Sequence, residues 1–435
     1  MNFARVFAFL IILGGGIMAC KKNDETASKD IRDSVYYKTQ QYYLWTDNLP
    51  SASSFNPTSY DSPEAVMEKV RTYSPVGSSG SNVDRWSFAI SKETWDAYSS
   101  GTGSDFGIGF AWAATNDLRI AYAYKNSDAG TNGVARGWQV VSINSVAATN
   151  DNVDALNTAL DGNSVVMVFT KPDGTQQTLT LTKTSYQTNP VLHKSIITKG
   201  STKIGYIVLN SFLGDTAEDE LNEAFSYFKS NGVTELVFDE RYNGGGYVDL
   251  AEKVANLIAP TSAAGKVMYQ DTHNSYLSSW NETISFDASL PSNNLNLSQV
   301  IFITTGSTAS ASELLINILK PYVTVKIVGE TTYGKPVGYY AVSVMDYYTF
   351  PVAVKQVNAE GTGDYYDGFT ADRTETDDVT VDWGDTSEDC LSDALTYITT
   401  GAFPASTGGR LATNLKVSNQ KLQNKNHFVG AIFAR

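Results

Sequence analysis

Two apolar runs separated by a helical pattern constrain the fold of this chain more than any other feature. The runs Val300–Ile303 and Val323–Val328 are typical of buried strands, and the leucines and isoleucines of residues 314–319 recur at helical spacing. A strand, a helix and a second strand of this length form a unit in which the strands are parallel. The segments that follow the two strands are therefore expected at the same edge of one sheet.

Hydroxyl groups follow the first strand and a lysine follows the second. Ser310 lies in the first turn with Thr308 and Ser312, and Lys335 lies in the second loop. Serine attacks a carbonyl when a base removes its proton, and lysine is such a base only as the neutral amine. Lowering the lysine pKa from about 10.4 to about 7–8 requires about 4 kcal/mol, which burial can supply. The expected wall of that pocket is Tyr333, Val337, Tyr339 and Tyr340.

Each of these residues also has an ordinary explanation. A serine before a helix is commonly an N-cap, and a lone lysine in a loop is commonly a solvated charge. A third signal favours chemistry, because the apolar run 234–238 leads directly into Asp239–Gly246, which ends in three glycines. Adjacent glycines allow positive φ and close backbone approach, which suits amides directed at an oxyanion. A glycine-rich turn with a structural Asp–Arg pair is the alternative.

These features together resemble a known family. The TASASE segment at residues 308–313, Lys335 and the loop of residues 239–246 are similar to the C-terminal processing, or tail-specific, serine peptidases. The resemblance implies a ClpP/crotonase-like catalytic domain, with Ser310 as the nucleophile and Lys335 as its general base.

The same resemblance implies roles for neighbouring residues. An oxyanion hole would be formed by the Ala311 amide with Gly245 or Gly246. The residues that it implies shape the site are Asp239, Arg241 and Asn243. Four positions depart from the family pattern: Tyr339 replaces a glutamine that orients the lysine, Glu240 an apolar residue, Gly244 a proline and Ala371 another proline.

The first residues have the pattern of a secretory signal. Arg5 precedes an apolar run from Val6 to Ile17, which is too short to span a membrane. Residues Ile17–Cys20 are similar to a bacterial lipoprotein cleavage box, which implies removal of residues 1–19 and a lipid on Cys20. Residues 20–26 would then be a tether. The chain is expected to be exported and anchored to an envelope membrane, on its periplasmic or cell-surface side; an ordinary signal with an incidental Cys20 is the alternative.

The charge of the chain excludes one class of partner. A formal net charge of −14 argues against nucleic acid, because phosphate binding needs a basic surface. The three histidines, His193, His273 and His427, are expected at the surface or at caps, although a Ser–His site is an alternative. We expect no metal and no diffusible cofactor. The acidic residues between 372 and 389 are expected in a solvated loop, with calcium binding as the alternative.

The residues before the catalytic region divide into two segments. Helical spacing predicts a helical domain over residues 27–102, and short strands with turn signals predict a β-rich module over residues 103–185. The second segment is similar to a PDZ domain, and the residues in the place of its carboxylate-binding loop are Gly107, Ile108, Gly109 and Phe110. Such a module captures a peptide tail by β-augmentation. A barrel that only gates the protease groove is the alternative.

Strand and helix patterns alternate over residues 186–402, which predicts an α/β domain with a mainly parallel sheet. Residues 265–291 are expected to be irregular, as a lid or a substrate wall. Cys390 is expected as a small buried apolar residue on a helix. Residues 403–435 have one short apolar stretch, at 428–433, so this extension could be packed or loose.

The predicted function is a serine endopeptidase that cleaves exported or unfolded proteins through an acyl-enzyme. The substrate is expected to be held by its C-terminal tail; the oligomeric state has no sequence signal. A non-catalytic lipoprotein that binds peptides or an apolar ligand on the same fold is the alternative.

Overall fold

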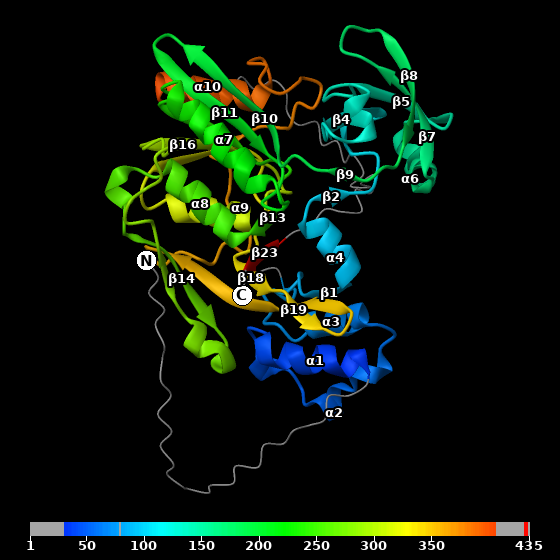
Figure 1. Ribbon diagram of the computed structural model, residues 1–435, viewed down its shortest axis with the longest axis vertical. Helices are drawn as coiled ribbons and strands as arrows, with labels where there is room; N and C mark the ends of the chain where they lie inside the picture. The colour runs from blue at the N-terminus through cyan, green and yellow to red at the C-terminus, as the bar shows by residue number, and fades with distance from the viewer. Residues whose placement is uncertain (1–29, 78–79, 406–429, 434–435) are drawn as a thin grey trace, which may run out of the picture.

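The computed structural model describes residues 30–77, 80–405 and 430–433 (Figure 1). The predicted signal at residues 1–19, the tether and the lipidation site Cys20 lie outside the described residues. Most of the 403–435 extension lies outside them as well. Among the helices of the described part, none is long and apolar enough to cross a membrane.

A six-stranded sheet in the order β10-β11-β12-β16-β17-β22 forms the centre of the fold. Its strands are β10 Val191–Lys199, β11 Thr202–Leu209, β12 Glu235–Asp239, β16 Gln299–Thr304, β17 Thr324–Gly329 and β22 Arg373–Thr374. Every neighbouring pair is parallel except β10 with β11. The predicted mainly parallel sheet is therefore confirmed, and the segments after β12, β16 and β17 leave it at one edge.

Helices cover both faces of the central sheet (Figure 1). One face packs on α7 Ala217–Ser230, α8 Val248–Ile258 and α9 Ala311–Leu319, and the other packs on α10 Asp389–Thr400. Strand β16 shows why both faces need a cover. Val300 and Phe302 face the three helices while Ile301 and Ile303 face α10, and all four side chains are fully buried.

A second six-stranded sheet lies beside the first, in the order β13-β23-β18-β21-β14-β15. Its strands are β13 Gly245–Tyr247, β14 Val267–His273, β15 Thr283–Ser285, β18 Val337–Tyr340, β21 Val352–Asn358 and β23 Gly430–Phe433. The prediction that residues 265–291 are irregular is wrong, because β14 and β15 lie within them. Strand β23 shows that the end of the 403–435 extension is packed.

The N-terminal region is mostly helical, as predicted. Its helices are α1 Ile31–Tyr42, α2 Ala52–Phe55, α3 Pro63–Arg71 and α4 Lys92–Ser99. Ser62 caps α3 and Pro63 occupies its first turn, as the sequence indicated. Strand β1 Phe88–Ser91 pairs with β20 Tyr347–Phe350, which pairs with β19 Val342–Val344. The N-terminal helices therefore share one apolar core with the strands that follow Lys335.

Residues 103–185 form a compact β-rich module with its own apolar core. Its main elements are β3 Ile108–Ala114, β4 Asp117–Ala123, α5 Asp128–Thr131, β5 Gln139–Ile143, β6 Val146–Ala147, α6 Val153–Asp161, β7 Ser164–Thr170 and β8 Gln176–Thr182. Strand β3 is at one edge of the order β3-β4-β5-β7-β8. Two short strands, β2 Thr102–Gly103 and β9 Tyr186–Gln187, pair at the two ends of the module.

Candidate active site

Ser310 lies where the turn after β16 meets α9, which begins at Ala311. Its backbone has φ 62° and ψ −109°, a conformation that a residue with a side chain rarely adopts. The residue is 1% exposed, and its Oγ has no hydrogen-bond partner among the described residues. A strained backbone that presents an unpartnered hydroxyl is typical of a functional position.

The Glu313 carboxylate joins the Ser310 turn to the Lys335 loop. Its Oε2 accepts hydrogen bonds from the backbone nitrogens of Ser310, at 2.9 Å, and Lys335, at 2.8 Å. Its Oε1 accepts from the Gly334 nitrogen at 2.7 Å and the Thr332 hydroxyl at 2.6 Å. Burial raises the pKa of Glu313, and these four hydrogen bonds oppose the shift. The backbones of the two predicted dyad residues therefore meet at a single oxygen atom.

Lys335 is buried between aromatic side chains. It is 1% exposed, and its Nζ lies 3.4 Å from the centre of the Tyr339 ring and 5.9 Å from that of Trp86. Burial lowers the pKa of Lys335 well below its usual value, although the carboxylates of Asp84 and Glu313 favour the charged amine. The predicted dry environment is present, with Tyr339 as its closest wall.

Residues 84–88 complete the lysine pocket from the far N-terminal region. One oxygen of Asp84 accepts from the nitrogens of Trp86 at 2.9 Å and Ser87 at 3.0 Å, and the other accepts from the Ser87 hydroxyl at 2.7 Å. The Tyr339 hydroxyl donates to the Trp86 carbonyl at 3.0 Å. This contact fixes the ring on which the lysine rests.

The glycine loop after β12 lies against the Ser310 turn. The Ala309 nitrogen donates to the Asn243 carbonyl at 3.1 Å, and the Thr308 hydroxyl donates to the Glu240 carbonyl at 2.9 Å. The Asn243 side chain accepts from the Gly245 nitrogen at 2.9 Å. The three segments predicted at one sheet edge, after β12, β16 and β17, are therefore in contact.

Gly246 is required at its position by both space and backbone angle. Its φ is 140°, and a Cβ there would lie 2.4 Å from the Phe212 carbonyl carbon. On either side of it, the Gly245 carbonyl accepts from the Phe212 nitrogen and the Tyr247 nitrogen donates to the Phe212 carbonyl. Because successive residues of a strand direct their amides to opposite sides, the Gly246 N–H points away from Phe212.

Glu240 is a buried acid in this loop. It is fully buried, and neither of its carboxyl oxygens has a hydrogen-bond partner in the part of the chain that the structure describes. Burial, with the neighbouring carboxylates of Glu313 and Asp239, raises its pKa well above the usual range. A neutral acid is therefore expected where the family pattern has an apolar residue.

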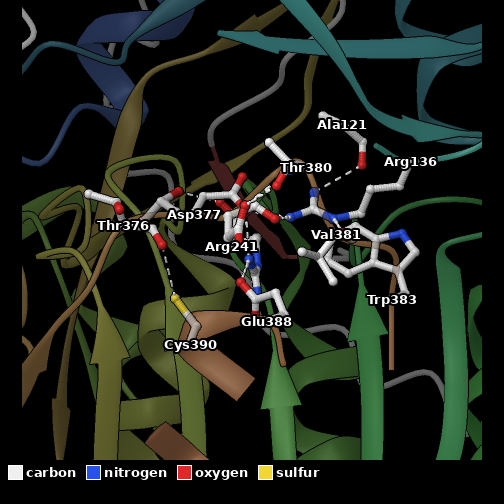
Figure 2. A network of polar contacts seen from close by, with 12 residues as sticks. Ala121, Arg136, Arg241, Thr376, Asp377, Thr380, Val381, Trp383, Glu388 and Cys390 are labelled. Carbon is white, nitrogen blue, oxygen red and sulfur yellow. Dashed lines mark hydrogen bonds and ion pairs between the residues drawn. The ribbon is translucent and has the colours of Figure 1, made fainter. Parts of the chain in front are cut away.

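Arg241 is the centre of a second polar network (Figure 2). Its buried guanidinium pairs with Asp239 at 2.7 Å, Asp377 at 2.6 Å and Glu388 at 2.9 Å. Asp377 also pairs with Arg136 of the β-rich module at 2.5 Å, and the Arg136 guanidinium lies 3.9 Å from the centre of the Trp383 ring. Burial opposes ionisation of Asp377, but the two guanidiniums outweigh it and lower its pKa.

Three predictions about side chains near the site need correction or confirmation. The acidic segment 372–389 is not simply solvated, because Asp377 and Glu388 are enclosed by the arginines. His273 is not at the surface: it is 7% exposed, and its Nε2 lies 2.8 Å from the Tyr340 hydroxyl. Cys390 is buried, as predicted. No group of three His, Cys, Asp or Glu side chains within the described ranges could hold a metal ion.

A cavity lies between the β-rich module and the glycine loop. Its lining includes Asp105, Tyr122, Tyr124, Tyr186, Tyr242 and Gly244. Of the predicted carboxylate-binding residues, Ile108, Gly109 and Phe110 begin the edge strand β3, while the Gly107 nitrogen donates to Asp105 at 2.7 Å. The module and the glycine loop therefore share one tyrosine-rich space.

Comparison with known proteins gives the family of this region. Residues 203–372, which contain Ser310, Lys335 and the glycine loop, match the family described as Peptidase family S41. This region is similar to the S41 peptidases.

Relatives of the S41 domain include proteins named as CtpA-like serine proteases. One from Staphylococcus aureus is 27% identical over 262 residues, which are 58% of this chain and 49% of the relative. One from Staphylococcus saprophyticus is 25% identical over 260 residues, with the same coverage. The chain thus spans about half the length of the curated relatives it matches. A crystal structure described as an S41 protease from Bacteroides fragilis has a TM-score of 0.69 and 25% identity, and covers 85% of this chain and 97% of its own.

Several site residues escaped the sequence prediction. Glu313 had a detectable signal, because serine followed three positions later by glutamate is the capping-box pattern. Residues 84–88 resemble a short family motif, but the bond that places Trp86 beside Tyr339 spans 253 positions and was not predicted. Arg136 had no signal, because its bond to Asp377 spans 241 positions.

We expect Glu313→Gln to lower the free energy of unfolding by about 2–4 kcal/mol, because it leaves two buried N–H or O–H donors facing an amide NH₂. Denaturant unfolding of both proteins measures the change. Glu218→Gln is the control, because the Glu218 side chain is half exposed and pairs with Lys253 at the surface. Its free energy of unfolding should stay within about 0.5 kcal/mol of that of the parent. An unchanged Glu313→Gln protein would contradict the proposed anchoring.

We expect Asp377→Asn to destabilise the fold by about 3 kcal/mol near neutral pH, because Arg136 and Arg241 lose a shared carboxylate. Since the folded pKa of Asp377 is lowered, its contribution is complete above about pH 5 and declines as the pH falls below about 3.9. Denaturant unfolding across that range measures the difference. The exposed Asp382→Asn in the same loop is the control; a difference that grows on acidification would contradict the assignment.

Proposed function

We propose that this chain is a serine endopeptidase of the C-terminal processing type that acts through a Ser310–Lys335 dyad. The observation that carries the proposal is the shared Glu313 oxygen, which brings the backbones of both residues together. The S41 domain and the CtpA-like relatives support the same chemistry.

The reaction proceeds in two steps. Ser310 Oγ attacks the scissile carbonyl while its proton passes to the neutral amine of Lys335, which returns it to the leaving amine. Water then attacks the ester while its proton passes to Lys335, which returns it to Ser310 Oγ as the ester bond breaks and the acyl product leaves. Burial of the lysine is favourable here because it keeps the amine neutral, and the Tyr339 ring replaces the usual glutamine as its support.

The negative oxygen of the tetrahedral intermediate needs two amide donors. Ala311 begins α9, and the Gly246 N–H points away from its Phe212 neighbour, so these two amides are the preferred pair. Gly245 is the weaker candidate, because its nitrogen already donates to Asn243. Asp239 and Arg241 hold the loop that carries them.

The β-rich module acts as a PDZ-like receptor for the substrate's C-terminal tail. The edge strand β3, with Ile108, Gly109 and Phe110, offers its backbone to the tail, and the tyrosine-rich cavity leads from it to Gly244. Capture of a terminal carboxylate at Gly107 requires Asp105 to release that amide. The enzyme is exported and lipid-anchored at Cys20 to a bacterial envelope membrane.

We expect purified protein to cleave an unfolded substrate such as reduced casein, and Ser310→Ala to abolish cleavage. Lys335→Met, which keeps a long unbranched side chain, should lower the rate about 10²–10⁴-fold because it removes the base. Peptide release read by mass spectrometry measures both. Activity that survives Lys335→Met would contradict the dyad, and peptide binding by an inactive parent would favour a binding protein instead.

We expect kcat/KM to rise with pH through an apparent pKa well below the ordinary value of about 10.4, because the buried Lys335 must be neutral to act. At a pH between the lowered pKa of Lys335 in the folded protein and its ordinary pKa, Lys335 is protonated in the unfolded chain and deprotonated in the folded one. The stability of the parent relative to Lys335→Met should therefore rise with pH in the same window. A rate that increases only near pH 10 would contradict a buried base.

A further inference from the structure

The chain places a distant segment of its own beside the catalytic glycines. Strand β23, Gly430–Phe433, inserts between β13 and β18 and is parallel to both. Strand β13 carries Gly245 and Gly246, and β18 begins two residues after Lys335. In Figure 1 the red β23 lies at the junction of the two sheets, next to β13 and β18.

The backbone of β13 is directed at this segment. Gly245 and Tyr247 bond to Phe212, so the N–H and carbonyl of Gly246 point to the opposite edge, where Ala431 is its register partner. A peptide whose carbonyl is to reach the Gly246 amide must occupy that same edge. Strand β23 therefore lies where an extended substrate would bind.

Ile432 shows how a side chain fits this position. It is 2% exposed and is the register partner of Tyr247 on β13 and Tyr339 on β18. It belongs to the apolar cluster that contains Leu213, Val337 and Tyr339. Because Tyr339 also supports the Lys335 amine, an aliphatic side chain here packs against the ring that positions the base.

We propose that the slot between β13 and β18 is the substrate strand position, that it selects an aliphatic side chain at the Ile432 place, and that Gly430–Phe433 is an intramolecular competitor for it. This inference rests on the proposed peptidase function. A substrate must displace β23 before its carbonyl can reach the Gly246 amide. An intramolecular segment acts at an effective concentration on the order of 1 mM, so displacement lowers the apparent substrate affinity.

The test uses the full chain with Ile432→Asp, which places a charge in the apolar slot. We expect kcat/KM for an unfolded protein substrate to rise about tenfold. This is the change expected if β23 competes at an effective concentration of about 1 mM and binds the slot with a dissociation constant of about 0.1 mM. Ile284→Asp, on the edge strand β15 of the same sheet, is the matched control and should leave kcat/KM unchanged.

A binding measurement separates this inference from the proposed function. A fluorescent peptide with the sequence of residues 426–435 should bind the Ser310→Ala, Ile432→Asp double variant at least about tenfold more tightly than it binds Ser310→Ala alone. The same peptide with aspartate at the Ile432 place should not bind. If the double variant binds the peptide more tightly but neither the parent nor any variant hydrolyses protein, the peptidase function is contradicted and the assignment of the slot is supported.

Two results would overturn the inference. One is a folded double variant that does not bind the peptide while the parent chain hydrolyses protein. The other is an Ile432→Asp protein that loses activity and cooperative unfolding, with neither restored by the peptide, because β23 would then be a permanent part of the sheet.

Discussion

The Glu313 carboxylate accepts four hydrogen bonds from the two loops that carry Ser310 and Lys335. Movement of either loop would leave a buried acceptor and its donors unpaired, each at a cost of about 1–3 kcal/mol. This constraint explains how the strained φ of Ser310 persists, since the carboxylate fixes its nitrogen from one side and α9 fixes the chain from the other. The backbone nitrogen of Lys335 donates to the same Glu313 oxygen as the backbone nitrogen of Ser310, so the lysine loop is held beside the serine turn.

The site divides its charges between two networks. Around Lys335 the surroundings are aromatic, and burial lowers the pKa of the amine, whereas around Arg241 three carboxylates pair with a fully buried guanidinium. The loop from Asp239 to Gly246 joins the two networks, because Asp239 pairs with the Arg241 guanidinium and the last two glycines pair with β23. Since Asp377 bonds both Arg241 and Arg136, the position of the β-rich module is tied to the same loop.

The elements that local patterns specify could be predicted from the sequence. Strand β16, helix α9 and strand β17 combine strong periodicity with short connections, so the residue pattern alone predicts Ser310 and Lys335 at one sheet edge. Strand β14 was missed because Gln270, Asp271 and Thr272 give it a polar composition, and its alternate burial depends on pairing with β21. Trp86, Arg136 and β23 reach the site through contacts between remote segments, which no local pattern encodes. The roles of the predicted oxyanion and tail-binding residues depend on contacts with substrate, which a pattern of residues does not specify.

Removal of β23 from the second sheet would expose the backbone edges of its two neighbouring strands. Strands β13 and β18 would then face each other across a gap, each with an unpaired row of N–H and carbonyl groups. Open strand edges of this kind recruit other chains and promote aggregation. A strand supplied by the same chain closes this gap, so β23 also keeps the edges of β13 and β18 from pairing with neighbouring molecules.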